Sequence, residues 1–145
     1  MKNKIIKFKI VTPEQIVLEE EITQVSVPTK EGEITVLPDH IPLVASLKPG
    51  VIEITTADNK NNIIAISGGF IEVLKNKVVI LADTAERAED INIDRVQAAK
   101  KQAKITKQDT RHFDQERFAN ISAKISKELA RSSAVQRWKK IKNIK

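Results

Sequence analysis

Proline and glycine are confined to the first half of this 145-residue chain. All five prolines lie at or before Pro49, and the last of the four glycines is Gly69. Because these residues interrupt helices and mark turns, the first half is rich in turn signals, whereas the second half offers an uninterrupted background for helices. The chain is therefore expected to fold into a strand-rich part followed by a helical part.

Short apolar segments with alternating or β-branched residues fill the first half. Ile6, Phe8 and Ile10 alternate with lysines, as in a strand that buries one face. Similar segments follow at 25–27, 51–55, 63–66 and 78–81, and polar hairpin loops are predicted at 58–62 and 75–77. Many short strands at regular spacing indicate a β-sandwich or a β-barrel.

The second half has the apolar spacing of helices. Asp90 or Asn92 can cap a first helix, because a short side-chain oxygen there accepts free backbone N–H groups. Apolar residues recur every three or four positions within three groups. These are Val96, Ala99 and Ala103; Phe118, Ile121, Ile125 and Leu129; and Val135, Trp138 and Ile141. The polar segment 106–112 interrupts this pattern without a strong helix breaker. The pattern alone therefore leaves open a helical hairpin or one long, interrupted helix.

Charge is divided in the same way as proline and glycine. Residues 1–84 contain nine Lys and Arg against eleven Asp and Glu, whereas residues 85–145 contain sixteen against eight. The net charges are −2 and +8. This asymmetry indicates two segments with different partners, and the basic segment could meet nucleic acid, an anionic membrane or an acidic protein surface.

Composition also limits the chemistry and the relation to membranes. The chain has no cysteine, which excludes disulfides, thiol nucleophiles and cysteine-based zinc sites. Lysines interrupt the apolar residues at the N-terminus, so a signal peptide is not expected there. No segment approaches the roughly 20 apolar residues that span a bilayer. We therefore expect a soluble protein that contacts a membrane only through a partner.

Two short motifs could carry chemistry, and each has a simpler structural explanation. His40 follows Asp39, but the only other histidine is His112, and no HExxH pattern or carboxylate cluster accompanies them. A structural role for His40 in a proline-flanked turn is therefore favoured. Gly68 and Gly69 lack the Lys-Ser/Thr of a phosphate-binding loop and are expected in a tight backbone turn. We predict no catalytic residue, no metal site and no cofactor.

Three segments, in order along the chain, resemble the epsilon subunits of F-type ATP synthases. Gly32 to Leu43 (GEITVLPDHIPL), followed by Leu47 to Gly50 (LKPG), is similar to the family's G-E-x-G-I-L-P-x-H-x-P-L and L-K-P-G block. Ser67 to Val73 (SGGFIEV) and Leu81 to Ile91 (LADTAERAEDI) are similar to two further family segments. Three such segments at the family's spacing are far more specific than any one of them.

The resemblance implies a fold and a function. The fold would be α+β, with an N-terminal antiparallel β-sandwich of two sheets at residues 1–87 and a C-terminal antiparallel helical hairpin at residues 88–145. The function would be that of a non-catalytic subunit in the central stalk of the rotor. This subunit couples proton-driven rotation to ATP synthesis and inhibits ATP hydrolysis through its helices. Thr35 and Asp39 depart from the family's glycine and small residue, which affects local loop geometry.

The resemblance also implies partners for the sandwich. It would bind the gamma subunit and the c subunits of the membrane rotor ring, with the acidic loop facing the ring. The residues expected at these contacts are Glu31, Gly32, Glu33 and His40. The complex would place the protein on the cytoplasmic face of the plasma membrane, as a peripheral component.

The hairpin is expected to have a partner of its own. It would either fold onto the sandwich or extend toward acidic segments of the beta subunits, to which its positive charge is complementary. The residues expected at the beta-subunit contact are Lys124, Lys127 and Arg131.

Some bacterial members of the family bind a regulatory ATP through an I/L-D-x-x-R-A motif at the first helix. Here the stretch reads INIDRV, so Arg95 matches the motif and Glu86 fits an associated position. Asn92, however, replaces the acid, and Val96 replaces the alanine. We therefore expect nucleotide binding through Glu86 and Arg95 to be weak or absent.

Two alternative functions are weighed against this interpretation. A nucleic-acid-binding module would use the basic second half, although the chain has no Tyr and only one Trp for stacking on bases. A small hydrolase would use His40. We expect neither, and we predict no nucleic-acid partner.

Overall fold

A computed structural model describes residues 4–108 and 115–143 of the chain. Within these residues the strands are β1 (Ile6–Val11), β2 (Ile16–Thr29), β3 (Gly32–Val36), β4 (Leu43–Leu47), β5 (Gly50–Thr56), β6 (Asn61–Ile66), β7 (Gly69–Leu74), β8 (Lys77–Ala82) and β9 (Ala85–Arg87). A 3₁₀ turn, η1 (Ala88–Asp90), then leads to two helices, α1 (Ile93–Gln108) and α2 (Gln115–Ile141).

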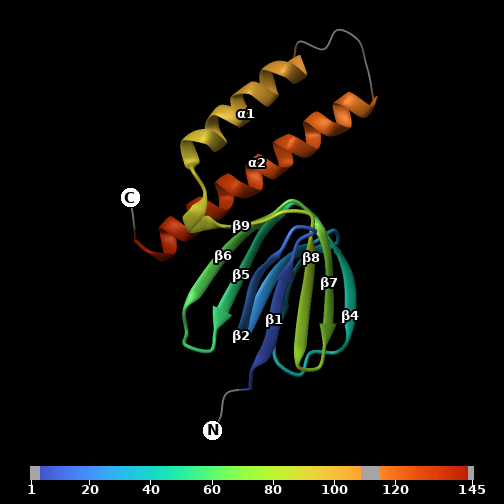
Figure 1. Cartoon of the computed structure of the whole chain (residues 1–145), viewed down its shortest axis with the longest axis vertical. Coiled ribbons are helices and arrows are strands. Elements are labelled where there is room, and N and C mark those ends of the chain that lie inside the picture. The colour runs from blue at the N-terminus through green and yellow to red at the C-terminus, as the bar shows by residue number, and fades with distance from the viewer. Residues whose placement is uncertain (1–3, 109–114, 144–145) are drawn as a thin grey trace.

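The strands form a two-layered sandwich, which confirms the predicted fold class (Figure 1). One layer contains β1, β8, β7 and β4, and the other contains β3, β2, β5, β6 and β9. The long strand β2 belongs to both, because its first half pairs with β1 and its second half pairs with β3 and β5. The two layers are thus joined by backbone hydrogen bonds as well as by side-chain packing.

One strand pair departs from the antiparallel arrangement that was predicted. β1 and β8 run parallel, with Phe8 opposite Val78 and Ile10 opposite Ile80. Six strands separate β1 from β8 in the chain, so no hairpin connection imposes an antiparallel direction on the pair. The other strand pairs in the described residues are antiparallel.

The main core lies between the two layers and is built from aliphatic side chains. Ile6, Phe8 and Ile10 of β1 are buried, as their alternation with lysines predicts. Similar inward-facing residues come from the other layer, among them Ile22, Val25, Ile52 and Ile54. All residues of this core belong to the strand-rich part of the chain, so helix residues are not needed to complete it.

The two helices form the predicted hairpin, and Asn92 caps the first of them. The Asn92 side-chain oxygen accepts a hydrogen bond from the Arg95 backbone N–H at 3.1 Å. Helix α1 continues to Gln108, so the first part of the predicted polar break at 106–112 is helical. The rest of that break lies outside the described residues. Helices α1 and α2 pack against each other along their lengths (Figure 1).

The C-terminal half of α2 carries the hairpin's contact with the sandwich. It packs on β5 and β6 in a second apolar cluster that contains Val51, Ile63, Ala65, Ala88, Ile91, Val96, Ala134 and Val135, with Ile93 and Trp138 at its edge. The other end of the hairpin projects beyond the strands (Figure 1). Because this cluster mixes residues from both sides of position 87, the domain division at 87 remains a prediction.

Candidate functional site

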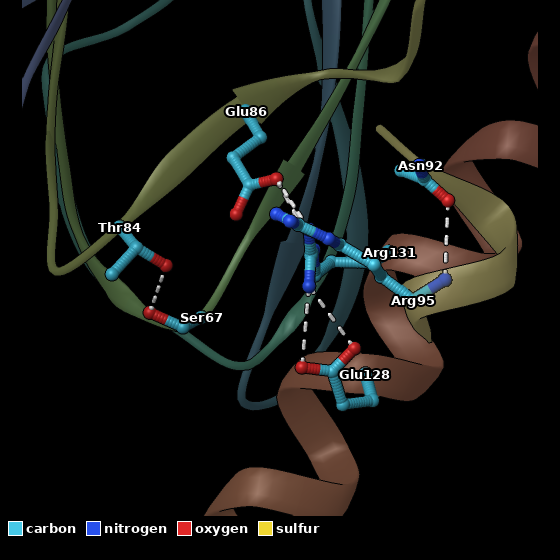
Figure 2. Close-up of polar contacts among 7 residues, drawn as sticks. All are labelled: Ser67, Thr84, Glu86, Asn92, Arg95, Glu128 and Arg131. Atoms are coloured by element: carbon cyan, nitrogen blue, oxygen red, sulfur yellow. Dashed lines mark hydrogen bonds and ion pairs between the residues drawn. The ribbon is translucent and has the colours of Figure 1, made fainter. Parts of the chain in front are cut away.

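The side chain of Arg131 joins helix α2 to the edge of the sandwich (Figure 2). Its Nε atom donates a hydrogen bond to Oε2 of Glu86 on β9 at 3.1 Å, and its Nη2 atom forms an ion pair with the same oxygen at 3.0 Å. Its Nη1 atom donates to both carboxylate oxygens of Glu128, one turn earlier on α2, at 3.2 and 3.3 Å. Glu86, Glu128 and Arg131, here named the Arg131 cluster, therefore place one guanidinium between two carboxylates.

The Arg131 cluster is shielded from solvent to different degrees. The Glu128 side chain is 7% exposed, that of Arg131 is 20% exposed, and that of Glu86 is 34% exposed. A buried carboxylate is costly unless a cation and hydrogen bonds compensate for its lost hydration. Arg131 supplies both to Glu128. The contact with Glu86 then extends the network across the interface.

Strand β9 holds Glu86 in position for this contact. The strand pairs with the edge of β6, where Glu86 lies opposite Ala65. The turn before β9 is fixed by a hydrogen bond from the Thr84 hydroxyl to the Ser67 hydroxyl, at 2.7 Å. Figure 2 shows this bond on the strand side of the cluster.

The two residues considered for a regulatory nucleotide, Glu86 and Arg95, have different surroundings. Glu86 is engaged by Arg131, and no sequence pattern predicted this pairing, because 45 positions separate the two residues. Arg95 lies at the start of α1 with an exposed side chain, and its contact with Asn92 is made by its backbone N–H. The pair Glu86 and Arg95 is not joined by a contact in the structure described here.

The three basic residues predicted to meet the beta subunits lie along one side of α2 by their helical spacing. Arg131 faces inward to Glu86, whereas Lys124 is exposed and Lys127 is half-buried. This difference follows from position along the helix, because the sandwich covers the C-terminal half of α2 and the other half projects beyond it (Figure 1). In the docked position, therefore, only part of this basic stripe faces solvent.

The segment Glu31-Gly32-Glu33, here named the acidic turn, runs from the turn after β2 into the start of β3. The Thr29 hydroxyl accepts a hydrogen bond from the Glu31 N–H and donates one to the Gly32 carbonyl. Glu31 and Glu33 are exposed, and Glu33 lines a groove together with Lys48 and with Arg137 of α2. The acidic turn is therefore close to the docked hairpin.

His40 lies at the opposite end of β3 from the acidic turn. Its Nδ1 atom is 2.7 Å from the Ile41 carbonyl oxygen, while the neighbouring Asp39 pairs with Lys4. The hydrogen bond from Lys4 lowers the pKa of the Asp39 carboxyl. Asp39 has a left-handed backbone with φ of 65°, which Asp tolerates better than most residues. The His40 ring thus contacts the backbone and Asp39 contacts Lys4, so the structure does not pair these two side chains with each other.

An exposed apolar patch on the outer face of the sandwich was missed by the sequence analysis. Phe70 on β7 lies opposite Leu81 on β8, and Val44 on β4 lies diagonally next to Phe70. Their exposed fractions are 57%, 55% and 71%. These three residues are named the outer patch. The alternation of Phe70 with the buried Ile71 could have indicated it, because neighbouring residues of a strand face opposite sides.

Metal-binding clusters and membrane-spanning helices are absent from the described residues. Within the described residues, no group of three or more His, Cys, Asp or Glu side chains is arranged to hold a metal ion. None of the helices in that part of the chain is long and apolar enough to cross a bilayer.

The sandwich thus carries an exposed apolar patch on one layer, and a helical hairpin is docked on the other through an apolar cluster and an ion-pair network. Comparison with known proteins gives the family. Residues 5–88 match the family model "ATP synthase, Delta/Epsilon chain, beta-sandwich domain". The chain belongs to the epsilon-chain family of ATP synthase, and is thus part of a membrane-associated complex.

Relatives in this family cover most of the chain. The ATP synthase epsilon chain of Nitratidesulfovibrio vulgaris (strain DP4) is 41% identical over 134 residues, which are 92% of this chain and 90% of the relative. The epsilon chain of Carboxydothermus hydrogenoformans is 48% identical over 99 residues, which are 68% of this chain and 73% of the relative.

Solved structures show the same fold. A chain in the mitochondrial ATP synthase of Euglena gracilis, solved as OSCP, F1 and c-ring, matches with a TM-score of 0.80 at 24% identity, covering 91% of this chain and 82% of that one. A chain in the central stalk and c-ring of the Tetrahymena thermophila mitochondrial enzyme matches with a TM-score of 0.63 at 15% identity, covering 93% and 99%.

Proposed function

We propose that this protein is a non-catalytic rotor subunit whose sandwich transmits rotation and whose hairpin inhibits ATP hydrolysis. The sandwich would bind gamma and the c subunits in the central stalk, so that proton-driven rotation reaches the catalytic headpiece without slip. The hairpin would be a two-state element, docked on the sandwich or extended toward the beta subunits. Family membership carries this proposal, together with the separation of the main core from the hairpin.

The outer patch is the surface that best suits gamma. Isolated exposed apolar residues are ordinary, but three neighbouring ones on adjacent strands favour a protein partner. Val44, Phe70 and Leu81 lie on the layer that α2 does not cover, so the hairpin does not compete for this face. The resemblance implied His40 among the residues that contact gamma or the rotor ring, and His40 lies in the connection that leads into β4.

The acidic turn is proposed to contact the rotor ring. Glu31 and Glu33 are exposed, and Thr29 fixes the backbone of the turn through its hydroxyl. Because Glu33 also lines the groove beside α2, movement of the hairpin would change the surroundings of this contact.

Lys124 and Lys127 are proposed to meet acidic segments of the beta subunits when the hairpin extends, and Arg131 would join them after leaving Glu86. The cytoplasmic face of the plasma membrane would be the location, since the headpiece and rotor ring of a bacterial complex meet there.

The outer patch provides the test of the proposed function. Val44→Asp and Phe70→Asp should each lower co-purification of gamma with the tagged subunit by roughly tenfold or more, because a charge would be buried in an apolar contact. The assay is a pull-down from native membranes, with gamma, alpha and beta subunits quantified. Ile105→Asp on α1 is the matched control, because Ile105 is also 55% exposed but lies outside the patch. Equal recovery of gamma with all three variants would contradict this contact, and no gamma with the unmodified subunit would contradict the function.

ATP is expected to bind the isolated subunit weakly or not at all. Asn92 caps α1 without supplying a carboxylate, and Glu86 is already engaged by Arg131. A nucleotide would therefore have to displace a guanidinium from its partner. Isothermal titration calorimetry should show no site tighter than about 100 μM, which corresponds to a binding free energy of only about −5.5 kcal/mol. A micromolar site would refute the prediction, and Glu86→Gln and Arg95→Gln would then identify its residues.

A further inference from the structure

We propose that the Arg131 cluster is a latch that holds the helical hairpin on the sandwich. Glu86 belongs to the sandwich, whereas Glu128 and Arg131 belong to α2, so the network spans the contact between the two parts. In Figure 2 the Arg131 side chain reaches from the helix to the strand edge, with Glu86 on one side and Glu128 on the other. Undocking of α2 would separate Arg131 from Glu86.

The geometry of the latch makes this separation costly. Arg131 uses Nε and Nη2 on one carboxylate and Nη1 on the other, so three of its nitrogen atoms are engaged. Undocking would break the two contacts with Glu86, whereas the contacts with Glu128 lie within α2 and would remain. Hydrogen bonds between ionised partners are stronger than neutral ones. Arg131 is also mostly shielded, which reduces the screening that makes exposed ion pairs weak.

The rest of the docking contact buries little apolar surface, so the latch contributes a larger share of the free energy of docking. The α2 residues in the apolar cluster with the sandwich are mainly small, namely Ala134 and Val135, with Trp138 half-buried. Small side chains remove little apolar surface from water, and the gain in free energy scales with that surface. The docked position therefore depends on the latch more than it would in a contact built from large aliphatic residues.

Glu128 restricts the orientation of the Arg131 side chain. It is buried on the same face of α2 as Arg131, so it orients the guanidinium toward the strand edge even before Glu86 is met. Two carboxylates also leave the cluster with a surplus of one negative charge. Loss of Arg131 would leave a buried carboxylate beside a second one, whereas loss of Glu86 would leave the Glu128 pair intact. We therefore expect Arg131→Gln to weaken docking more than Glu86→Gln.

Trp138 is a built-in reporter of docking. It is the only tryptophan of the chain, which has no tyrosine, and it lines a cavity at the sandwich edge together with Leu18 and Ile63. Undocking would transfer its indole to water and shift its emission to longer wavelength. Urea titration of the full-length subunit, followed by this emission, therefore measures docking. Circular dichroism of the strands follows the sandwich separately.

Arg131→Gln should lower the ratio of docked to undocked hairpin by about tenfold or more, and so lower the urea midpoint of the Trp138 transition. Lys140→Gln is the matched control, because Lys140 is an exposed basic residue on the same helix, and its variant should keep the original midpoint. Glu86→Gln should lower the midpoint by less. The double variant Glu86→Gln with Arg131→Gln should have the same midpoint as Arg131→Gln alone, since both changes break the same contact between Arg131 and Glu86.

Two results would overturn the latch. The first is an equal Trp138 midpoint for Arg131→Gln and Lys140→Gln. The second is additivity of Glu86→Gln and Arg131→Gln, which would mean that the two residues act separately. If Arg131→Gln does not yield folded protein, Glu86→Gln is compared with Glu72→Gln, a change at an exposed glutamate on β7, and equal midpoints for these two would overturn the latch as well. The latch concerns the isolated subunit, so its test does not depend on the proposed function.

Discussion

Deletion of residues 88–145 should raise the ATP hydrolysis rate of the assembled complex roughly two- to tenfold, which corresponds to an inhibiting hairpin in roughly half to nine-tenths of the complexes. ATP synthesis should remain largely intact. The main core has no helix residue, so the remaining strands should stay folded and keep the outer patch. Only the second apolar cluster, with Val51, Ile63 and Ala65 on the sandwich side, loses its cover.

The measurement is the hydrolysis rate of matched membranes that carry the full-length or the truncated subunit. Lys124→Gln with Lys127→Gln should reproduce part of the increase, because these residues project from the uncovered half of α2. Higher salt should weaken inhibition by the full-length subunit, since exposed charges are screened within about 10 Å at 0.1 M ionic strength. Equal hydrolysis rates for both subunits at every salt concentration would mean that the hairpin does not inhibit.

The latch provides a control variant that should change the hydrolysis rate in the opposite direction. Glu86 lies on the sandwich, so Glu86→Gln removes a docking contact without changing the basic stripe of the hairpin. It should favour the extended state and lower hydrolysis, whereas Lys124→Gln with Lys127→Gln should raise it. Arg131 serves the docked state through Glu86 and would serve the extended state through a beta subunit, so its neutralisation alone cannot separate the two roles.

The architecture was largely predictable because its signals are local. The alternation in β1, the turn residues between β5 and β6, and the cap at Asn92 each act within a few residues of the chain. The resemblance of the three segments to the family then predicted that a β-sandwich is followed by a helical hairpin. By contrast, the parallel pair of β1 with β8 is a long-range contact that no short pattern encodes.

The candidate site was predicted only in part, and the reason is also physical. Glu86 and Arg131 were each singled out, but for two different partners, because charge patterns do not say which distant charges meet. Leu129 was predicted on the apolar stripe of α2, yet it is 47% exposed, while the polar Glu128 beside it is buried. Helical spacing predicts which residues lie on the same side of α2. It does not predict which turns of the helix the sandwich covers, because that depends on how the helix docks.

Gly69 is the position at which a single methyl group should have the largest effect on folding. Gly69 begins β7 with φ of 141°, a backbone conformation that residues with a Cβ rarely adopt. A Cβ built there would lie 2.0 Å from the Leu81 carbonyl oxygen and 2.9 Å from the Ala82 Cα atom. Both are backbone atoms of the paired strand β8, so they cannot move aside without breaking the pairing between β7 and β8.

Gly69→Ala should therefore destabilise the protein by more than about 4 kcal/mol, which is a large share of the stability of a typical domain. Gly32→Ala is the matched comparison. Gly32 has a similar φ of 133°, but a Cβ there would have no atom within 4 Å. That variant carries the backbone strain alone, which costs about 1 to 3 kcal/mol. Thermal unfolding and the soluble yield of both variants measure the difference. If Gly69→Ala loses no more stability than Gly32→Ala, the close approach of β8 does not limit this position, and backbone conformation alone explains the glycine.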